Sequence, residues 1–251
     1  MTVPAYLPYV LFTGNVLSLA AIFYGLNKAL ADASWPRPER LRAVTVSAAI
    51  LLGWLAVAFG LSAAGFYHVT ANGIPTIQYG VVLPILVGVF LIFRSKLAWR
   101  ILDAVPQPWL VGVQLYRALG VVFLILYAAG QLPGLFALPA GIGDVAVGLS
   151  APFVALAYAR NPRAAAGRVR SWNLLGILDL VIAVTTGFLT APSLITPIEV
   201  HPSSELMTML PMVMIPVYLV PLSIVLHIAS LVKLHRAQVY AAGGKNARAA
   251  A

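Results

Sequence analysis

The stretch VGVQLYRALGVVFLILYAAGQLPGLFALPAGIGDVAVGLSAP, residues 111–152, decides the fold. It contains two apolar segments, each long enough to cross a bilayer as a helix, joined by a short loop that contains Pro and Gly. It also carries Arg117 and Asp144 within segments that otherwise suit hydrocarbon. Charged groups inside a membrane are rare, face the protein interior and mark functional pathways. The stretch therefore predicts a helical membrane protein with charges inside its bundle.

Composition extends this prediction to the whole chain. Of 251 residues, 61% are hydrophobic and 9% are charged, whereas about 25% of the residues in a soluble domain are charged. Apolar runs of nearly 20 residues recur along the chain, as transmembrane helices require. We therefore expect an all-α, polytopic integral membrane protein with seven transmembrane helices and a basic, disordered cytoplasmic tail over 234–251. The seven segments are residues 5–27, 41–63, 76–93, 109–129, 138–159, 172–189 and 209–233.

The cationic residues predict the orientation. The loops after the first, third and fifth segments and the tail all carry Lys or Arg, and the alternate loops carry none. By the positive-inside rule the N-terminus lies outside and the C-terminus lies in the cytoplasm. The net charge of +9 is then explained by contacts with anionic lipid headgroups on the cytoplasmic side of the bilayer, not with nucleic acid.

Several functional classes are excluded by residues that are absent or misplaced. Without cysteine there is no disulfide, thiolate catalysis or Cys-based zinc or iron–sulfur site. A retinal Schiff base is not expected, because every lysine lies in a loop or at a helix end. Seven-span zinc hydrolases carry an HxxxH pair in the last span, but here His227 is followed by Leu231. A bis-histidine haem is not expected, because His227 is the one histidine within a predicted segment.

Three ionisable residues are predicted to share one layer in the cytoplasmic half of the bundle. Arg117 lies about eight residues, or roughly 12 Å, into the fourth segment. Asp179 lies about as deep in the sixth segment and His227 in the seventh, while Gln114 shares the helix face of Arg117. An Arg117–Asp179 ion pair would offset an insertion cost of about 2.5–3.5 kcal/mol for each charge. Two interpretations of this layer remain open: it is an ion pair that only sets helix register, or it is a substrate-binding or proton-coupling site. His227 is correspondingly either a packing residue or a residue that titrates near neutral pH.

A second polar cluster is predicted at the outer face. Asp144 is placed in the first turns of the fifth segment, close to His68 and to the acidic loop before the seventh. His201 and Glu205 are four residues apart and would share a face if Pro202 opened a helix. With His68 they would supply three zinc ligands. The alternative is that these loop side chains are simply solvated.

The middle of the chain carries a family resemblance. Residues 106–189 include PQPWLVGVQLYRALG, LPGLFALPAGIGDVAVGLSAP and WNLLGILDLVIAVTTGFL. They resemble a recurrent type of uncharacterised bacterial multi-pass membrane protein. The resemblance implies a location in the bacterial inner membrane and brings with it no activity and no catalytic residues.

Three functions remain open at this point. The first is the binding or transport of a small solute or ion through the layer of Arg117, Asp179 and His227, without a cofactor. The second is a membrane-embedded metalloenzyme with a zinc site at the outer face. The third is an accessory or scaffolding subunit whose polar pairs only align the helices, so whether the chain is an enzyme stays open.

Overall fold

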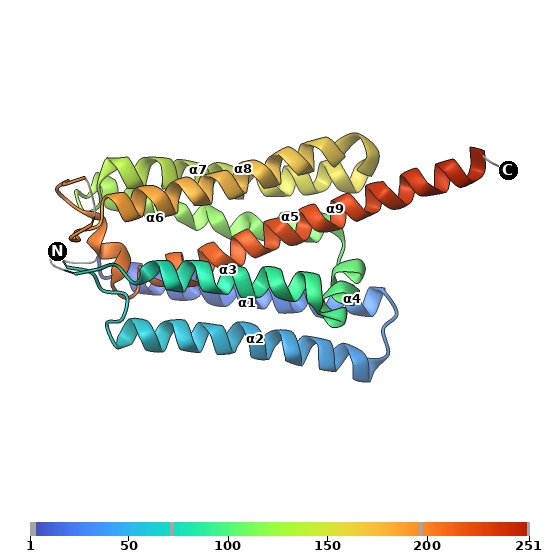
Figure 1. The fold of residues 1–251 in the computed structure, drawn as a ribbon, viewed down its shortest axis with the longest axis horizontal. Helices are drawn as coiled ribbons and strands as arrows, with labels where there is room; N and C mark the ends of the chain where they lie inside the picture. The colour runs from blue at the N-terminus through green and yellow to red at the C-terminus, as the bar shows by residue number, and fades with distance from the viewer. Residues whose placement is uncertain (1–3, 71–72, 196–197, 250–251) are drawn as a thin grey trace.

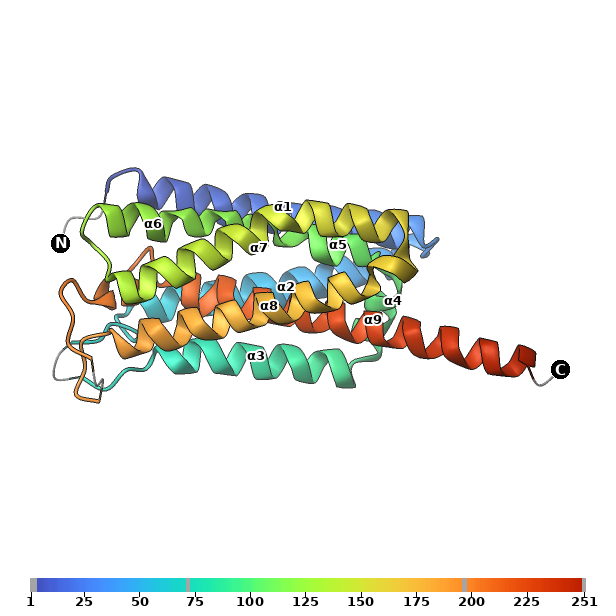
Figure 2. The same cartoon turned by 90° about the horizontal axis from the view of Figure 1, so that it is seen from above.

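The computed structural model describes residues 4–70, 73–195 and 198–249, with side chains up to residue 239. Within these residues, seven helical spans are long and apolar enough to cross a membrane. They run side by side along one axis and form an elongated bundle (Figures 1 and 2). The described part is helical without strands, which confirms the all-α prediction. The spans are Leu7–Asp32 (α1), Arg37–Ala63 (α2), Ile77–Arg94 (α3), Gln107–Ala128 (α5, η1 and α6), Gly134–Arg160 (α7), Pro162–Leu189 (α8) and Ile215–Val239 (η3 and α9).

Local signals explain where the span bounds differ from the predicted ones. Helix α8 begins ten residues earlier than predicted, because the Asn161 side chain accepts a hydrogen bond from the backbone N–H of Ala164 and Pro162 occupies the first helical position. The last span begins six residues later than predicted, because Pro211 lies in a turn that precedes the helix. That span opens with a π turn, η3 (Ile215–Leu219), which contains Pro216.

The tail differs from its prediction. Helix α9 runs over Val220–Ala249, so the backbone stays helical through most of the tail for which disorder was predicted. The added turns contain five alanines, which are good helix formers, and continue through Gly243 and Gly244, which are poor ones. Residues 250–251 of that predicted tail lie outside the described residues.

The fourth span is not a regular α-helix. It consists of α5 (Gln107–Gly112), the 3₁₀ helix η1 (Val113–Gly120) and α6 (Val121–Ala128). The buried residues of η1 are Gln114, Arg117 and Gly120. Their spacing of three matches the three residues per turn of a 3₁₀ helix, so one side of η1 faces the interior along its whole length.

The charged residues divide the bundle into two ends. The described Lys and Arg residues other than Arg117 lie in four places: the α1–α2 turn, the α3–α5 connection and the α7–α8 turn, each with the helix ends that adjoin it, and the last part of α9. All four lie at one end of the bundle, which we call the basic end (Figure 1). The opposite end, which we call the neutral end because its connections contain no Lys or Arg, consists of the connections 64–76, 129–133 and 190–214 as far as they are described, and it carries Glu199 and Glu205. The alternation seen in the sequence is therefore a physical separation of charge.

A short helix closes the basic end. Helix α4 (Lys96–Ala104) is capped by the Ser95 hydroxyl, which accepts a hydrogen bond from Ala98 N–H. Lys233 of α9 donates to the carbonyl of Leu102 at 2.7 Å, and Arg236 forms an ion pair with Asp103 at 2.9 Å. These cations bind the free carbonyl groups at the C-terminal end of α4 and hold α4 against α9.

Close approach of α1 to the fourth span yields a stability prediction. A Cβ atom on Gly25 would overlap the indole ring of Trp109. Replacing Gly25 by Ala should therefore push α1 away and lower the free energy of unfolding by about 1–3 kcal/mol. The matched control is Gly53→Ala on α2, where nothing lies within 4 Å of the added Cβ. It should be neutral or stabilising by up to about 1 kcal/mol, as measured by unfolding in mixed micelles; equal effects of both substitutions would contradict this packing.

Candidate functional site

The guanidinium of Arg117 joins four transmembrane elements. Its Nε donates to Asp144 Oδ1 at 2.8 Å and its Nη2 donates to Asp179, so one cation pairs with carboxylates from both α7 and α8. Its Nη1 donates to the carbonyl of Gly176 at 3.2 Å and contacts His227 Nε2 at 3.0 Å. The Arg117 side chain is 2% exposed. We call Arg117, Asp144, Asp179 and His227 the ion cluster.

A chain of hydrogen bonds continues from the ion cluster toward the basic end. Because a guanidinium can only donate, His227 Nε2 accepts from Arg117 and the ring proton resides on Nδ1. His227 Nδ1 then donates to Asn173 Oδ1 at 2.8 Å, and Asn173 Nδ2 donates to Ser230 Oγ at 2.9 Å. Gln107 Nε2, at the start of α5, also donates to Ser230 Oγ at 2.6 Å. His227, Asn173 and Ser230 are fully buried, so this polar chain lies inside the bundle.

Glycines make the ion cluster sterically possible. A Cβ atom on Gly143 would collide with the Asp179 carboxylate, and one on Gly120 would collide with Asp144. On Gly176 it would lie 2.5 Å from His227 Nε2. Each charged side chain therefore occupies space that a larger residue on the neighbouring helix would fill, as small residues allow at helix interfaces in membranes.

The cluster differs from the sequence-based prediction in depth and membership. Asp144 was expected near the outer face, but it follows the first residue of α7 by ten residues, about 15 Å of helix. Helix α7 begins four residues earlier than predicted, which moves Asp144 inward. The 3₁₀ segment rises about 2.0 Å per residue instead of 1.5 Å, which moves Arg117 away from the basic end. The two therefore meet near the middle of the bundle, and the layer does not lie in the basic half.

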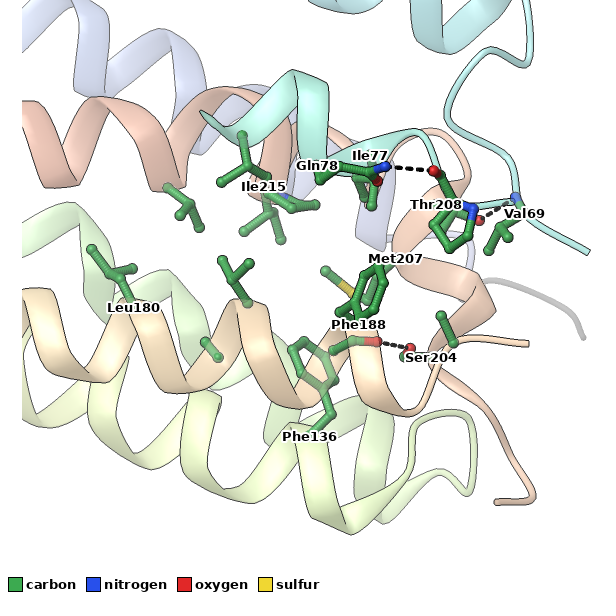
Figure 3. A pocket seen from close by; sticks show the side chains of 18 of the residues that line it. Val69, Ile77, Gln78, Phe136, Leu180, Phe188, Ser204, Met207, Thr208 and Ile215 are labelled. Carbon is green, nitrogen blue, oxygen red and sulfur yellow. Dashed lines mark hydrogen bonds between the residues drawn. The ribbon is translucent and has the colours of Figure 1, made fainter. Parts of the chain in front are cut away.

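An apolar cavity extends from the neutral end to the ion cluster. Its volume is about 80 Å³, room for about three water molecules. Figure 3 shows Phe136 of α7, Leu180 and Phe188 of α8, and Ile77 of α3 around it. Ser204 and Thr208 of η2 (Ser204–Thr208) line it toward the neutral end (Figure 3), and their hydroxyls bond to backbone groups. Among the residues that line this cavity, Asp144 is the one with a charged side chain.

A second, smaller cavity adjoins Arg117 and shares lining residues with the first. It has a volume of about 30 Å³ and is lined by both Arg117 and Asp144. Phe123, Leu180, Ile215 and Val220 line both cavities together with Asp144. Free space inside the neutral half of the bundle therefore reaches both members of the Arg117–Asp144 pair.

The predicted zinc ligands are not assembled in this structure. His68 Nε2 and Glu205 Oε1 lie 3.2 Å apart and form a partly exposed pair. The helix η2 begins at Ser204, so Pro202 does not open a helix that would carry His201 and Glu205 on one face. Across residues 4–70, 73–195 and 198–249, no group of three His, Asp or Glu side chains is placed to hold a metal ion.

Some polar residues of the site escaped the sequence analysis. Gln107 lies before the predicted fourth segment and was taken for loop, and Asn173 lies at the predicted start of the sixth. The spacing of Asn173, Gly176 and Asp179 by three was a usable signal, since it places all three near one face of α8. Gln114 does share the inward side of η1 with Arg117, but it donates to the carbonyl of Ser223 at 3.1 Å and not to the ion cluster.

Comparison with known proteins identifies the family. Residues 74–235 match a family described as a domain of unknown function, DUF8737. The chain belongs to this family. The match spans α3 to α9 and includes the ion cluster and the polar chain to Gln107. No curated protein and no solved structure matches the chain.

The arrangement predicts unequal effects of neutralising its charges. Arg117→Met leaves two buried carboxylates without their counter-charge and should cost about 3–5 kcal/mol of unfolding free energy. Asp179→Asn leaves one cation and one anion, and its amide oxygen can still accept from Arg117. The free energy of unfolding of this variant should lie within about 1 kcal/mol of that of the wild type. Size-exclusion profiles and denaturant unfolding of both purified variants check this order, and a reversed order would contradict the charge balance described here.

Proposed function

We propose that this protein binds, and by changing conformation transports, a small solute or ion at the ion cluster in a bacterial inner membrane. The observation that carries this proposal is a route through the bundle. The apolar cavities lead from the neutral end to Arg117 and Asp144, and the hydrogen-bond chain continues from His227 to Gln107 at the basic end.

The two sides of the ion cluster differ in how far they are filled. On the neutral side the cluster adjoins free space, whereas on the basic side it is closed by the hydrogen bonds that join Asn173, Ser230 and Gln107. A site open toward one side and closed toward the other is what alternating access requires of a transporter. The π turn η3 opens the last span and lines the cavity, and such turns occur frequently at functional sites.

The proposed orientation places the neutral end outside and the basic end in the cytoplasm, because cationic loops stay on the cytoplasmic side. The natural absence of cysteine makes this directly testable. Ile74→Cys introduces a thiol at the neutral end, at a residue that is 69% exposed, and Gln238→Cys introduces one on the exposed face of α9. A membrane-impermeant maleimide should label the Ile74→Cys variant in intact spheroplasts and the Gln238→Cys variant only after lysis. The opposite pattern would reverse the proposed orientation.

Access to the ion cluster tests the proposed function itself. Ala183 lines the cavity and Ala229 lies in the apolar core nearer the basic end, and both are 8% exposed. A small methanethiosulfonate reagent added outside should modify the Ala183→Cys variant at least about tenfold faster than the Ala229→Cys variant, because only the first thiol adjoins free space. If the two react equally slowly, the cluster is sealed and the scaffolding alternative replaces solute binding.

A further inference from the structure

The cavity combines an apolar wall with one charged group. Phe123, Phe136, Leu180 and Val184 are among the apolar residues that line it. Asp144 lies among them, 8% exposed, and also lines the smaller cavity beside Arg117. A molecule held here would therefore bury an apolar body and present one polar group to a carboxylate.

With both carboxyl groups ionised, the ion cluster carries one more negative than positive charge. Arg117 of η1 faces Asp144 of α7 and Asp179 of α8, and His227 of α9 is held neutral as the acceptor of an Arg117 hydrogen bond. The charged groups on the packed elements thus sum to one cation and two carboxylates. Inside a bilayer an unbalanced charge is costly, so the cluster is complementary to one additional positive charge.

One carboxylate oxygen is available for that charge. Both contacts of Arg117 with Asp144 involve Oδ1. Oδ2 lies toward Gly120, which lines the smaller cavity, and it has no hydrogen-bond partner among the residues that the structure describes. A buried carboxylate oxygen that adjoins free space is an acceptor for an ammonium or another strong donor.

We infer that the ligand of this cavity is a small molecule with an apolar body and a single amino group. Its ammonium pairs with Asp144 and balances the charge of the cluster. Its apolar body lies against Phe123 and Phe136 on one side and against α8 on the other. This inference rests on the proposed function and specifies the chemical class of the solute.

Three molecules that share one apolar body and differ in charge can test it. Benzylamine is a cation near neutral pH, benzyl alcohol is neutral and benzoate is an anion. Each is added to the purified Ala183→Cys variant, and the concentration that halves the rate of methanethiosulfonate labelling is measured. Benzylamine should protect at a concentration at least about tenfold lower than either of the others. Labelling of the Ile74→Cys variant, which lies outside the cavity, should be unchanged by all three.

A second substitution assigns the preference to Asp144. In the Ala183→Cys background, Asp144→Asn should bring benzylamine to the level of benzyl alcohol. The matched control, Asp103→Asn on exposed α4, should leave the tenfold preference intact. The ranking of the three molecules is measured in a protein that retains Asp144. It therefore tests the inference even if the Asp144→Asn variant does not fold.

Other outcomes separate this inference from the proposed function. If benzoate protects best, Arg117 selects anions and the inference is wrong, while solute binding at the cluster stands. If the thiol is labelled rapidly and none of the three protects it, the amine class is likewise wrong. If the Ala183→Cys variant is not labelled at all, the proposed function fails first.

Discussion

The structure depends on one guanidinium that is shared by two carboxylates. Arg117 contacts Asp144, Asp179, the Gly176 carbonyl and His227, so η1, α7, α8 and α9 must all approach the same few atoms. A charge inside a bilayer is tolerated when it is paired within the protein, and here each pairing partner comes from a different helix. Charge balance therefore fixes the relative depth of these helices more strictly than contacts between apolar side chains, which lipid can replace.

The backbone meets this constraint in two ways. Glycines at 120, 143 and 176 leave room for the charged side chains at helix interfaces. The 3₁₀ winding of η1 aligns Gln114, Arg117 and Gly120 on one side of the span. The ion cluster then separates two different interiors, since the neutral side contains apolar free space and the basic side contains the hydrogen-bonded Asn173, Ser230 and Gln107.

The sequence predicted the features that follow from composition and missed those that depend on local winding. Long apolar runs gave the seven spans, and the alternation of cationic loops gave the separation into two ends. Depth counting brought Arg117, Asp179 and His227 together, because the errors in the bounds of their three spans all move these residues in the same direction, away from the basic end. It misplaced Asp144, since the early start of α7 moves Asp144 away from the neutral end and the longer rise of η1 moves Arg117 away from the basic end, so that the two residues meet. Contacts such as His68 with Glu205 depend on loop conformation, to which helical periodicity does not apply.

The second carboxylate argues for a site that does more than align helices. One acid would balance Arg117 and hold two spans in register, so a further ionised group adds an insertion cost of a few kcal/mol without adding a new cation. The residue that adjoins the cavities, Asp144, retains an oxygen without a partner among the described residues, while Asp179 already supplies a counter-charge to Arg117. An arrangement in which Arg117 can remain paired with Asp179 while Asp144 binds another cation allows the cluster to exchange partners. A purely structural ion pair has no use for that exchange, and a binding site requires it.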